Sequence, residues 1–181
     1  MDCGNSGTLA RLLIGILSTT PNIEVKVRGD DSLNRRNMRE LIDIMSDFGA
    51  EFLPSKKYKF PLNLISSEIP IGIEYKAGVS AQLKSAVILA GLNSYGKTKI
   101  SESHKSRNHT ENMLRNNLKV IKIKEGNTNF IEVFGKRELK YFCALFDVVT
   151  GHRKYAVNIF RWPFLIFRTF STWSRDTVNM Q

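Results

Sequence analysis

The sequence predicts an α/β fold in which a unit of strand–helix–strand–helix–strand–strand occurs twice. Segments that alternate apolar and polar residues are separated by segments with helical spacing of apolar residues. The same order of segments returns after about 70 residues, which is typical of a modular domain whose units share one core. A hydrophobic content of 42% in 181 residues is sufficient for such a core. The first copy lacks the opening strand.

The first copy starts with a helix expected at residues 5–18, where Leu9, Leu12 and Ile16 fall on one face. Gly49 is the expected C-terminal cap of the next helix, because glycine tolerates the left-handed conformation found there. The remaining elements of this copy are a strand at 23–27, a helix at 36–48, and short strands at 50–53 and 62–65.

The second copy has the complete set of elements. Its first helix is apolar nearly all round, which predicts a buried helix. The expected elements are a strand at 71–75, helices at 80–93 and 109–118, and strands at 97–101, 120–124 and 130–134.

Composition restricts the class of protein. The formal net charge is +10, but the Lys and Arg residues are scattered and form no nucleic-acid motif, so we expect no nucleic-acid partner. The two cysteines, Cys3 and Cys143, give neither a disulfide framework nor a metal-binding spacing. No apolar run reaches the ~20 residues that span a bilayer, and no signal peptide is recognisable. We therefore expect a cytoplasmic protein without a metal or a membrane partner.

Two predicted helices begin with small hydroxyl, amide and glycine residues. One start is Asn5-Ser6-Gly7-Thr8 and the other is Ser80-Ala81-Gln82. A helix N-terminus has free backbone N–H groups and a partial positive charge, so both starts suit an anion. A plain helix cap is the alternative interpretation of each. The strand and the arginine-bearing turn that follow each start favour phosphate binding.

Four motifs with the same order and spacing resemble the 5-enolpyruvylshikimate-3-phosphate synthase family. They are Asn5-Ser6-Gly7-Thr8 with Arg11, Gly29-Asp30-Asp31-Ser32-Leu33 with Arg36, the helical run 80–92, and Ser106-Arg107-Asn108-His109-Thr110-Glu111. The resemblance covers about residues 1–135, an internal stretch of a protein more than twice as long. It implies an incomplete domain of the enolpyruvyl-transferase type, an inside-out α/β barrel of βαβαββ units with helices inside and sheets outside.

The resemblance also implies an activity, which is transfer of enolpyruvyl from phosphoenolpyruvate to shikimate 3-phosphate with release of phosphate. No cofactor is implied. The positions that match the shikimate 3-phosphate site are Ser80, Ala81, Gln82 and Ser106. Those that match the phosphoenolpyruvate site are Gly7 and Arg36, with Asn5 and Thr8 shaping the loop. Asn37 stands where the family has proline, so we expect a looser turn beside Arg36.

No catalytic residue is identified in this chain, because the family's acid–base groups come from a second domain. We therefore expect a fragment with half of the site and little activity alone, and a separately encoded second domain is a candidate partner. From residue 136 to 181 the match ends and aromatic residues increase. We interpret this segment as a frameshift or a fused gene remnant, with an unusual native C-terminus as the alternative.

Two further functions stay open at this point. One is transfer of enolpyruvyl to a UDP-sugar, UDP-N-acetylglucosamine, by a related enzyme of the same fold. The glycine–aspartate motif at residue 29 and the motif at residue 106 favour the shikimate enzyme. The other is a non-catalytic basic module that binds RNA or an acidic partner. Such a module should lose affinity steeply as salt is raised.

Overall fold

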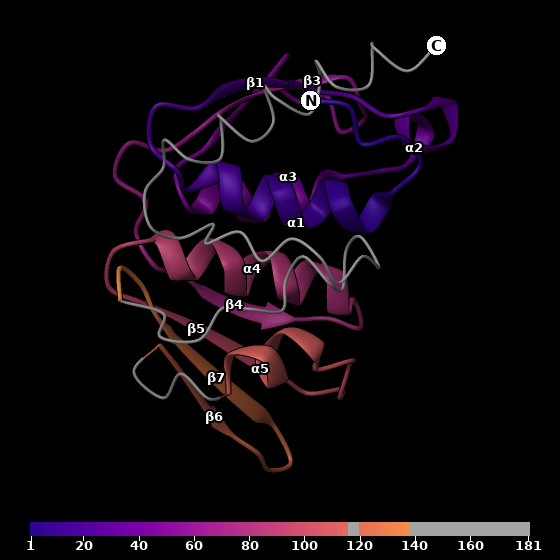
Figure 1. The fold of residues 1–181 in the computed structure, drawn as a ribbon. Helices are drawn as coiled ribbons and strands as arrows, with labels where there is room; N and C mark the ends of the chain where they lie inside the picture. Colours follow the sequence, from indigo (N-terminus) through magenta and orange to yellow (C-terminus); the bar gives the residue numbers. More distant parts are fainter. Residues whose placement is uncertain (116–119, 138–181) are drawn as a thin grey trace, which may run out of the picture. The chain divides into compact units, whose positions relative to one another are not determined.

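The computed structural model describes residues 1–115 and 120–137, which belong to the compact unit Met1–Glu138. These residues form two β-sheets with helices between them (Figure 1). Most of the segment 136–181 lies outside the described residues, so its interpretation stays a prediction. The helices are α1 (Gly7–Ser18), α2 (Asp31–Arg35), α3 (Arg39–Asp47), α4 (Ala81–Asn93) and α5 (His109–Leu114). The strands are β1 (Glu24–Val27), β2 (Glu51–Leu53), β3 (Leu62–Ile65), β4 (Glu74–Ala77), β5 (Lys97–Glu102), β6 (Ile121–Lys124) and β7 (Asn129–Phe134).

The sheet topology confirms the expected repeat. The first sheet has the strand order β1-β3-β2, and both pairs are antiparallel. The second sheet has the order β4-β5-β7-β6, with β4 parallel to β5 and the other pairs antiparallel. In chain order, β5, β6 and β7 of the second copy therefore correspond to β1, β2 and β3 of the first.

The expectation that the first copy lacks its opening strand is only partly right. Asp2 forms a parallel bridge with Arg28, just beyond the end of β1. The Cys3 N–H donates to the Arg28 carbonyl over 2.8 Å, and the Arg28 N–H donates to the Met1 carbonyl over 3.0 Å. Residues 1–3 thus take the place, relative to β1, that the end of β4 takes relative to β5.

The helix expected at 36–48 is present as α3, which starts three residues later and ends one residue earlier, and the short helix α2 before it was not expected. The Asp30 carboxylate accepts from the Leu33 N–H over 2.8 Å and starts the short helix α2. Arg36 then has extended backbone angles, φ −70° and ψ 140°, so α2 ends there. The Asn37 side chain accepts from the Arg39 N–H over 2.9 Å and so holds the turn into α3. Gly49 follows α3 with φ +95°, which confirms its expected capping role.

Other boundaries differ by a few residues. The expected strand at 71–75 starts later, as β4. Gly72, before it, approaches the backbone of Lys97 so closely that a Cβ would lie 2.5 Å from it. Ile71 makes only one parallel bridge, with Tyr95. The helix expected at 109–118 is described as far as Leu114 in α5, and residues 116–119 lie outside the described residues.

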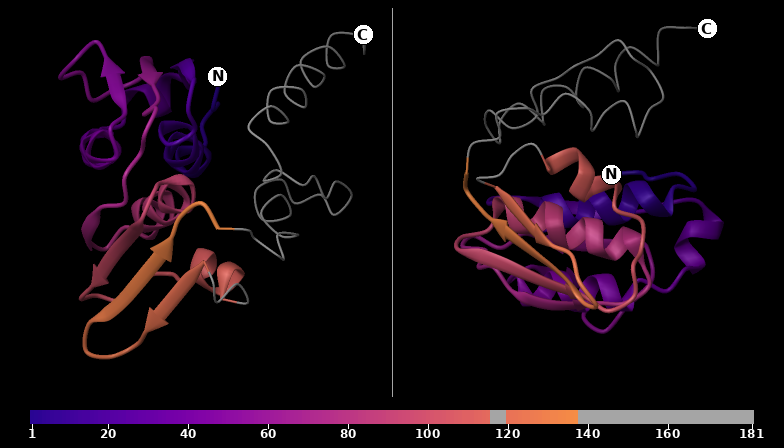
Figure 2. Two further views of the ribbon diagram at one scale, coloured as in Figure 1. Left: turned by 90° about the vertical axis from the view of Figure 1, so that its left-hand side faces the viewer. Right: turned by 90° about the horizontal axis from the view of Figure 1, so that it is seen from below.

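Helices α1 and α4 lie side by side and run parallel. Near their N-termini the Gln82 amide donates to the Thr8 hydroxyl over 2.7 Å, and near their C-termini the Asn93 amide donates to the Thr19 carbonyl over 2.5 Å. The helices cross closely at Gly15, where a Cβ would lie 2.6 Å from the α4 backbone. Seen along the helix axes, α1, α3 and α4 lie between the two sheets (Figure 2, left). Most of α4 is buried, as its apolar sequence predicted.

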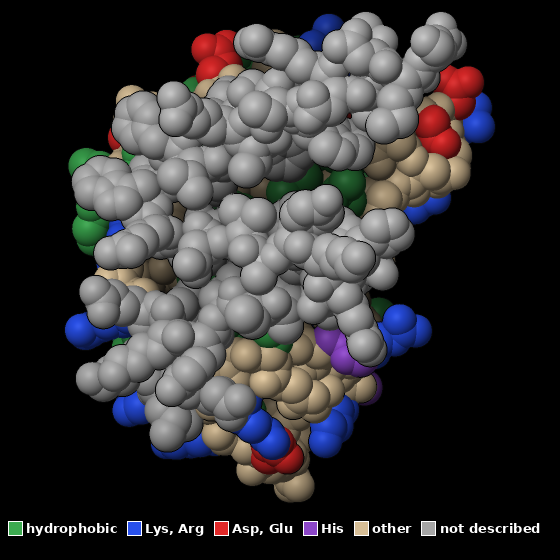
Figure 3. Space-filling model, in the orientation of Figure 1, with side chains coloured by type: hydrophobic (Ala, Val, Ile, Leu, Met, Phe, Trp, Pro, Cys, Tyr) green, Lys and Arg blue, Asp and Glu red, His purple; other side chains and the backbone are tan. Residues whose placement is uncertain are grey.

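Part of the positive charge lies on the outer face of the second sheet. Exposed lysines alternate with buried or half-buried residues along β5 and β6. In the view of Figure 3, Lys and Arg side chains are seen at the lower margins of the molecule. Lys99 and Lys122 lie on either side of Glu132 in the strand register, so opposite charges partly offset one another there. In the described residues, no helix is long and apolar enough to cross a membrane.

Candidate functional site

The candidate site begins where the N-termini of α1 and α4 meet. The hydrogen bond between Gln82 and Thr8 joins the first turns of the two helices, so their positive ends point to the same edge of the helix layer. Each helix end carries about half an elementary positive charge from its unpaired N–H groups. Two such ends together make a stronger anion site than either alone.

Each of the two helices is capped by a serine. The Ser6 hydroxyl accepts from the Leu9 N–H over 3.1 Å, and the Ser80 hydroxyl accepts from the Leu83 N–H over 3.4 Å. Both interpretations of these residues are compatible, because a cap uses only one of the free amides. Helix geometry leaves the amides of Ala81 and Gln82 without an acceptor inside α4. These amides are available to an anion.

Two arginines converge on Gly7 at the α1 end of the site. The Arg11 guanidinium donates to the Gly7 carbonyl over 3.0 Å, and the Arg36 guanidinium donates to the Asn5 side chain over 3.0 Å. A Cβ on residue 7 would lie 2.8 Å from Nη1 of each arginine, so glycine lets both guanidinium groups keep these positions and a larger residue would displace them. Burial and the adjacent charge of Arg36 lower the pKa of Arg11. A bound anion would relieve this repulsion between cations.

The glycine–aspartate motif positions Arg36. Gly29 and Asn34 bond to each other in both directions, over 3.0 and 2.8 Å, and Asp30 caps α2. A Cβ on Gly29 would lie 2.5 Å from the Leu33 side chain. The motif therefore builds a short helix that ends just before Arg36. This helix places Arg36 at the start of α1.

Ser106 is linked to α4 through a buried ion cluster. Its N–H and hydroxyl both donate to Oε1 of Glu102, over 2.8 and 2.6 Å. Lys84, in the first turn of α4, lies 2.9 Å from the same oxygen and 2.6 Å from Oε1 of Glu111. The Lys84 side chain is 0% exposed, and the two carboxylates are nearly as deep. The cluster ties β5, α4 and α5 together.

The carboxylate of Glu102 is held in its charged form. Burial alone would raise its pKa, but hydrogen bonds from Ser106, Lys84 and Asn129 outweigh that effect and lower the pKa to about 2. Glu102 is therefore ionised at neutral pH. The cluster contains one ammonium and two glutamates, so its fully ionised form would carry an excess negative charge. One oxygen of Glu111 has no hydrogen-bond partner in the described part of the chain.

The structure brings together seven of the eight expected site residues at the α1 and α4 helix starts, and Ser106 is the eighth. Gly7, Asn5 and Arg36 are in one contact network, and Thr8 bonds to Gln82. Ser80 and Ala81 precede and open α4 beside them. Arg11 belongs to a sequence motif, but no role was predicted for it. Its spacing of four residues from Gly7 could have indicated that its guanidinium reaches back to the helix start. Reasoning from the sequence also missed the Lys84 cluster.

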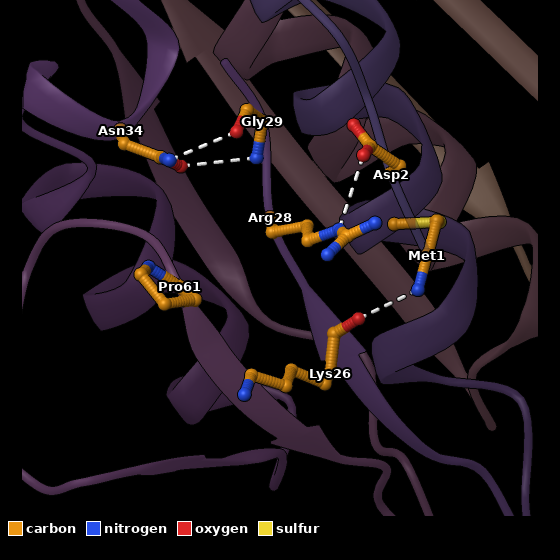
Figure 4. A pocket seen from close by; sticks show the side chains of 7 residues that line it. All are labelled: Met1, Asp2, Lys26, Arg28, Gly29, Asn34 and Pro61. Carbon is orange, nitrogen blue, oxygen red and sulfur yellow. Dashed lines mark hydrogen bonds and ion pairs between the residues drawn. The ribbon is translucent and has the colours of Figure 1, made fainter. Parts of the chain in front are cut away.

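A separate hollow of about 730 Å³ lies beside the outer edge of β1 (Figure 4). Several of its polar groups are paired with one another. Arg28 forms an ion pair with Asp2 over 3.0 Å, and the Met1 amine donates to the Lys26 carbonyl over 2.7 Å. Among the residues that the structure describes, no group of three or more His, Cys, Asp or Glu is placed to hold a metal ion.

Comparison with known proteins identifies the relatives of this chain. The model of the family EPSP synthase (3-phosphoshikimate 1-carboxyvinyltransferase) matches residues 1–146. The 3-phosphoshikimate 1-carboxyvinyltransferase of Thermodesulfovibrio yellowstonii is 46% identical over 117 residues, which are 64% of this chain and 27% of that protein. The enzyme of the same name from Paramagnetospirillum magneticum is 43% identical over 142 residues, or 77% of this chain and 32% of that protein.

A solved structure gives the same result. The EPSP synthase from Acinetobacter baumannii matches 76% of this chain with a TM-score of 0.66 and 35% sequence identity, and the match covers 31% of that protein. The chain thus spans only about a third of the length of its relatives or less.

Proposed function

The chain belongs to the EPSP synthase family, and we propose that it supplies the two anion-binding helix starts of such a synthase. In the reaction, enolpyruvyl passes from phosphoenolpyruvate to shikimate 3-phosphate and phosphate is released, as a step of chorismate and aromatic amino acid biosynthesis. The observation that carries the proposal is the convergence of the N-termini of α1 and α4 beside Arg11 and Arg36. Two anionic substrates require two adjacent positive sites.

We assign the phosphoryl group of shikimate 3-phosphate to the start of α4. The free amides of Ala81 and Gln82 offer hydrogen bonds to phosphoryl oxygens, and the helix dipole favours a dianion. The Ser80 hydroxyl lies beside these amides as the cap of the helix. Ser106 is the fourth residue of this half-site and joins it through the Lys84 cluster.

We assign phosphoenolpyruvate to the start of α1. A guanidinium presents a planar fork of donors that matches a carboxylate or a phosphate. Arg36 and Arg11 present two such forks at Gly7, where the missing Cβ lets the ligand approach the backbone. Asn5 orients Arg36, and Thr8 connects the two half-sites through its bond to Gln82.

The proton transfers of the reaction are not assigned to residues of this chain. Enolpyruvyl transfer needs a general acid for the methylene carbon and a general base for the substrate hydroxyl. We propose that these groups come from the part of the family's protein that this sequence does not cover. The chain alone would then bind the substrates without turning them over, and a separately encoded second domain is the partner that would complete the site. A cytoplasmic location fits such an enzyme.

Calorimetry with the full chain tests the two half-sites separately. Ser80→Ala should weaken binding of shikimate 3-phosphate by about three- to tenfold and leave phosphoenolpyruvate unchanged. Arg36→Ala should weaken binding of phosphoenolpyruvate and leave binding of shikimate 3-phosphate unchanged. Ser6→Ala is the matched control for Ser80→Ala, since it removes the same kind of cap from α1. Failure of the wild type to bind either substrate would refute the proposed function.

A turnover assay tests the division of labour. Phosphate release from the two substrates should stay at background with the purified chain and appear when the remaining part of a related synthase is added. Release by the chain alone that is lost in Arg36→Ala would contradict the fragment interpretation. The comparisons do not favour the UDP-sugar alternative, since the relatives named above are shikimate enzymes. Steep salt dependence with RNA would support the basic-module alternative.

A further inference from the structure

Ser106 lies in the loop between β5 and α5, and one carboxylate engages both of its hydrogen-bond donors. Its N–H and hydroxyl donate to the same oxygen of Glu102. Within the described part of the chain, these two bonds are the hydrogen bonds that join loop residues 103–107 to the rest of the fold. The position of Ser106 therefore depends on the position of Glu102.

Glu102 is itself fixed from two sides. Lys84 approaches one carboxylate oxygen to 2.9 Å, and the Asn129 amide donates to the other over 3.3 Å. Lys84 lies two residues after Gln82 in the first turn of α4, and its side chain is fully buried. A continuous chain of contacts thus runs from Ser106 through Glu102 and Lys84 to the helix start that we assign to the phosphoryl group.

We propose that Glu102 is a positioning residue that holds Ser106 at the N-terminus of α4, so that a phosphoryl group meets Ser106 and the α4 amides together. The proposal rests on the proposed function for its ligand. When the ligand binds, the Ser106 N–H stays on Glu102 and anchors the loop. The hydroxyl hydrogen is free to rotate and turns from the carboxylate to a phosphoryl oxygen.

Charge and burial make Glu102 suitable for this role. With a pKa of about 2 it is ionised at neutral pH, and hydrogen bonds to an ionised acceptor are roughly twice as strong as neutral ones. Without this anchor the loop would have to be ordered by the ligand, and that entropy cost would reduce the affinity. Holding the loop in advance removes the cost.

Three variants of the full chain separate positioning from simple stability. Glu102→Met removes both acceptor oxygens but leaves Lys84 paired with Glu111 over 2.6 Å, so the buried ammonium keeps a partner. Glu102→Gln keeps an oxygen that can accept from Ser106. Glu132→Met is the matched control, because it makes the same chemical change in β7 at a partly exposed ion pair with Lys97.

Binding by calorimetry gives the first readout. Glu102→Met should weaken shikimate 3-phosphate binding about tenfold and leave phosphoenolpyruvate binding unchanged. Glu102→Gln and Glu132→Met should stay within about threefold of the wild type. In a Ser106→Ala background the effect of Glu102→Met should vanish. Tighter or unchanged binding in Glu102→Met, an equal loss for both ligands, or the same loss without Ser106 would each overturn the proposal.

Amide hydrogen exchange of the Ser106 N–H gives a second readout that needs no ligand. The amide should be protected in the wild type and in Glu102→Gln, and it should exchange about tenfold faster in Glu102→Met. If the wild type fails to bind shikimate 3-phosphate, the proposed function is wrong, and exchange still decides the role of Glu102. Equal exchange in the wild type and Glu102→Met would overturn it.

Discussion

Replacing the buried Lys84 by methionine should destabilise the fold strongly. The substitution keeps the length of the side chain but removes the ammonium that lies 2.9 Å from Glu102 and 2.6 Å from Glu111. Two buried carboxylates then face each other without a cation. Removing one partner of a buried ion pair typically costs about 3–5 kcal/mol. Domains of this size have only about 5–15 kcal/mol of stability, so the loss is a large share of the total.

The matched control is Lys99→Met on the outer face of the second sheet. Lys99 also pairs with a glutamate, Glu74, but the two side chains are 52% and 76% exposed. Water screens such a pair, and its removal should cost less than about 1 kcal/mol. The two substitutions are chemically identical, so the difference between them measures the effect of burial.

Urea unfolding of the full chain, followed by far-ultraviolet circular dichroism, measures both losses from the shift in midpoint at constant slope. The penalty of Lys84→Met should shrink as the pH falls, because loss of the hydrogen bond from Lys84 removes one of the causes that lower the pKa of Glu102 and so lets this carboxylate protonate at a higher pH. A loss below about 1 kcal/mol at pH 7, or one equal to that of Lys99→Met, would refute the reasoning from the buried cluster.

Three other outcomes are expected. The folded-state pKa of Glu102 is lowered from 4.5 to about 2, so this group should contribute about 3 kcal/mol of stability above pH 4.5. This contribution should be lost as the pH falls through 2, and it should be absent in Glu102→Gln. Urea unfolding at a series of acid pH values measures it. Gly15→Ala should cost about 1–3 kcal/mol in the same assay, because its Cβ would meet the α4 backbone, whereas Gly78→Ala, with open space around it, should be neutral or slightly stabilising. Gly7→Ala should displace the two guanidinium groups and weaken phosphoenolpyruvate binding about tenfold in calorimetry, with shikimate 3-phosphate binding unaffected.

The order and type of most elements could be predicted from the sequence, because they depend on short-range patterns. Alternation identified the strands, apolar spacing identified α1, and a nearly continuous apolar run identified α4. The helix starts at Ser6 and Ser80 and the stop at Gly49 were recognisable from side chains that bond within a few residues. The short helix α2 was missed although its cap, Asp30, is equally local, and α3 starts three residues later than expected because the Asn37 side chain holds the turn before it.

The family and the candidate anion-binding residues followed from the sequence alone, because they occupy local motifs. The arrangement of those residues depended on packing. Arg36 reaches Gly7 only because α2 turns it toward α1, and α4 meets α1 only because Gly15 allows close contact. The role of Lys84 could not be predicted from the sequence of its mostly apolar helix, because its partners Glu102 and Glu111 come from β5 and α5. A buried charge is stable only where tertiary structure supplies its counter-charges, and sequence spacing does not reveal which charges those are.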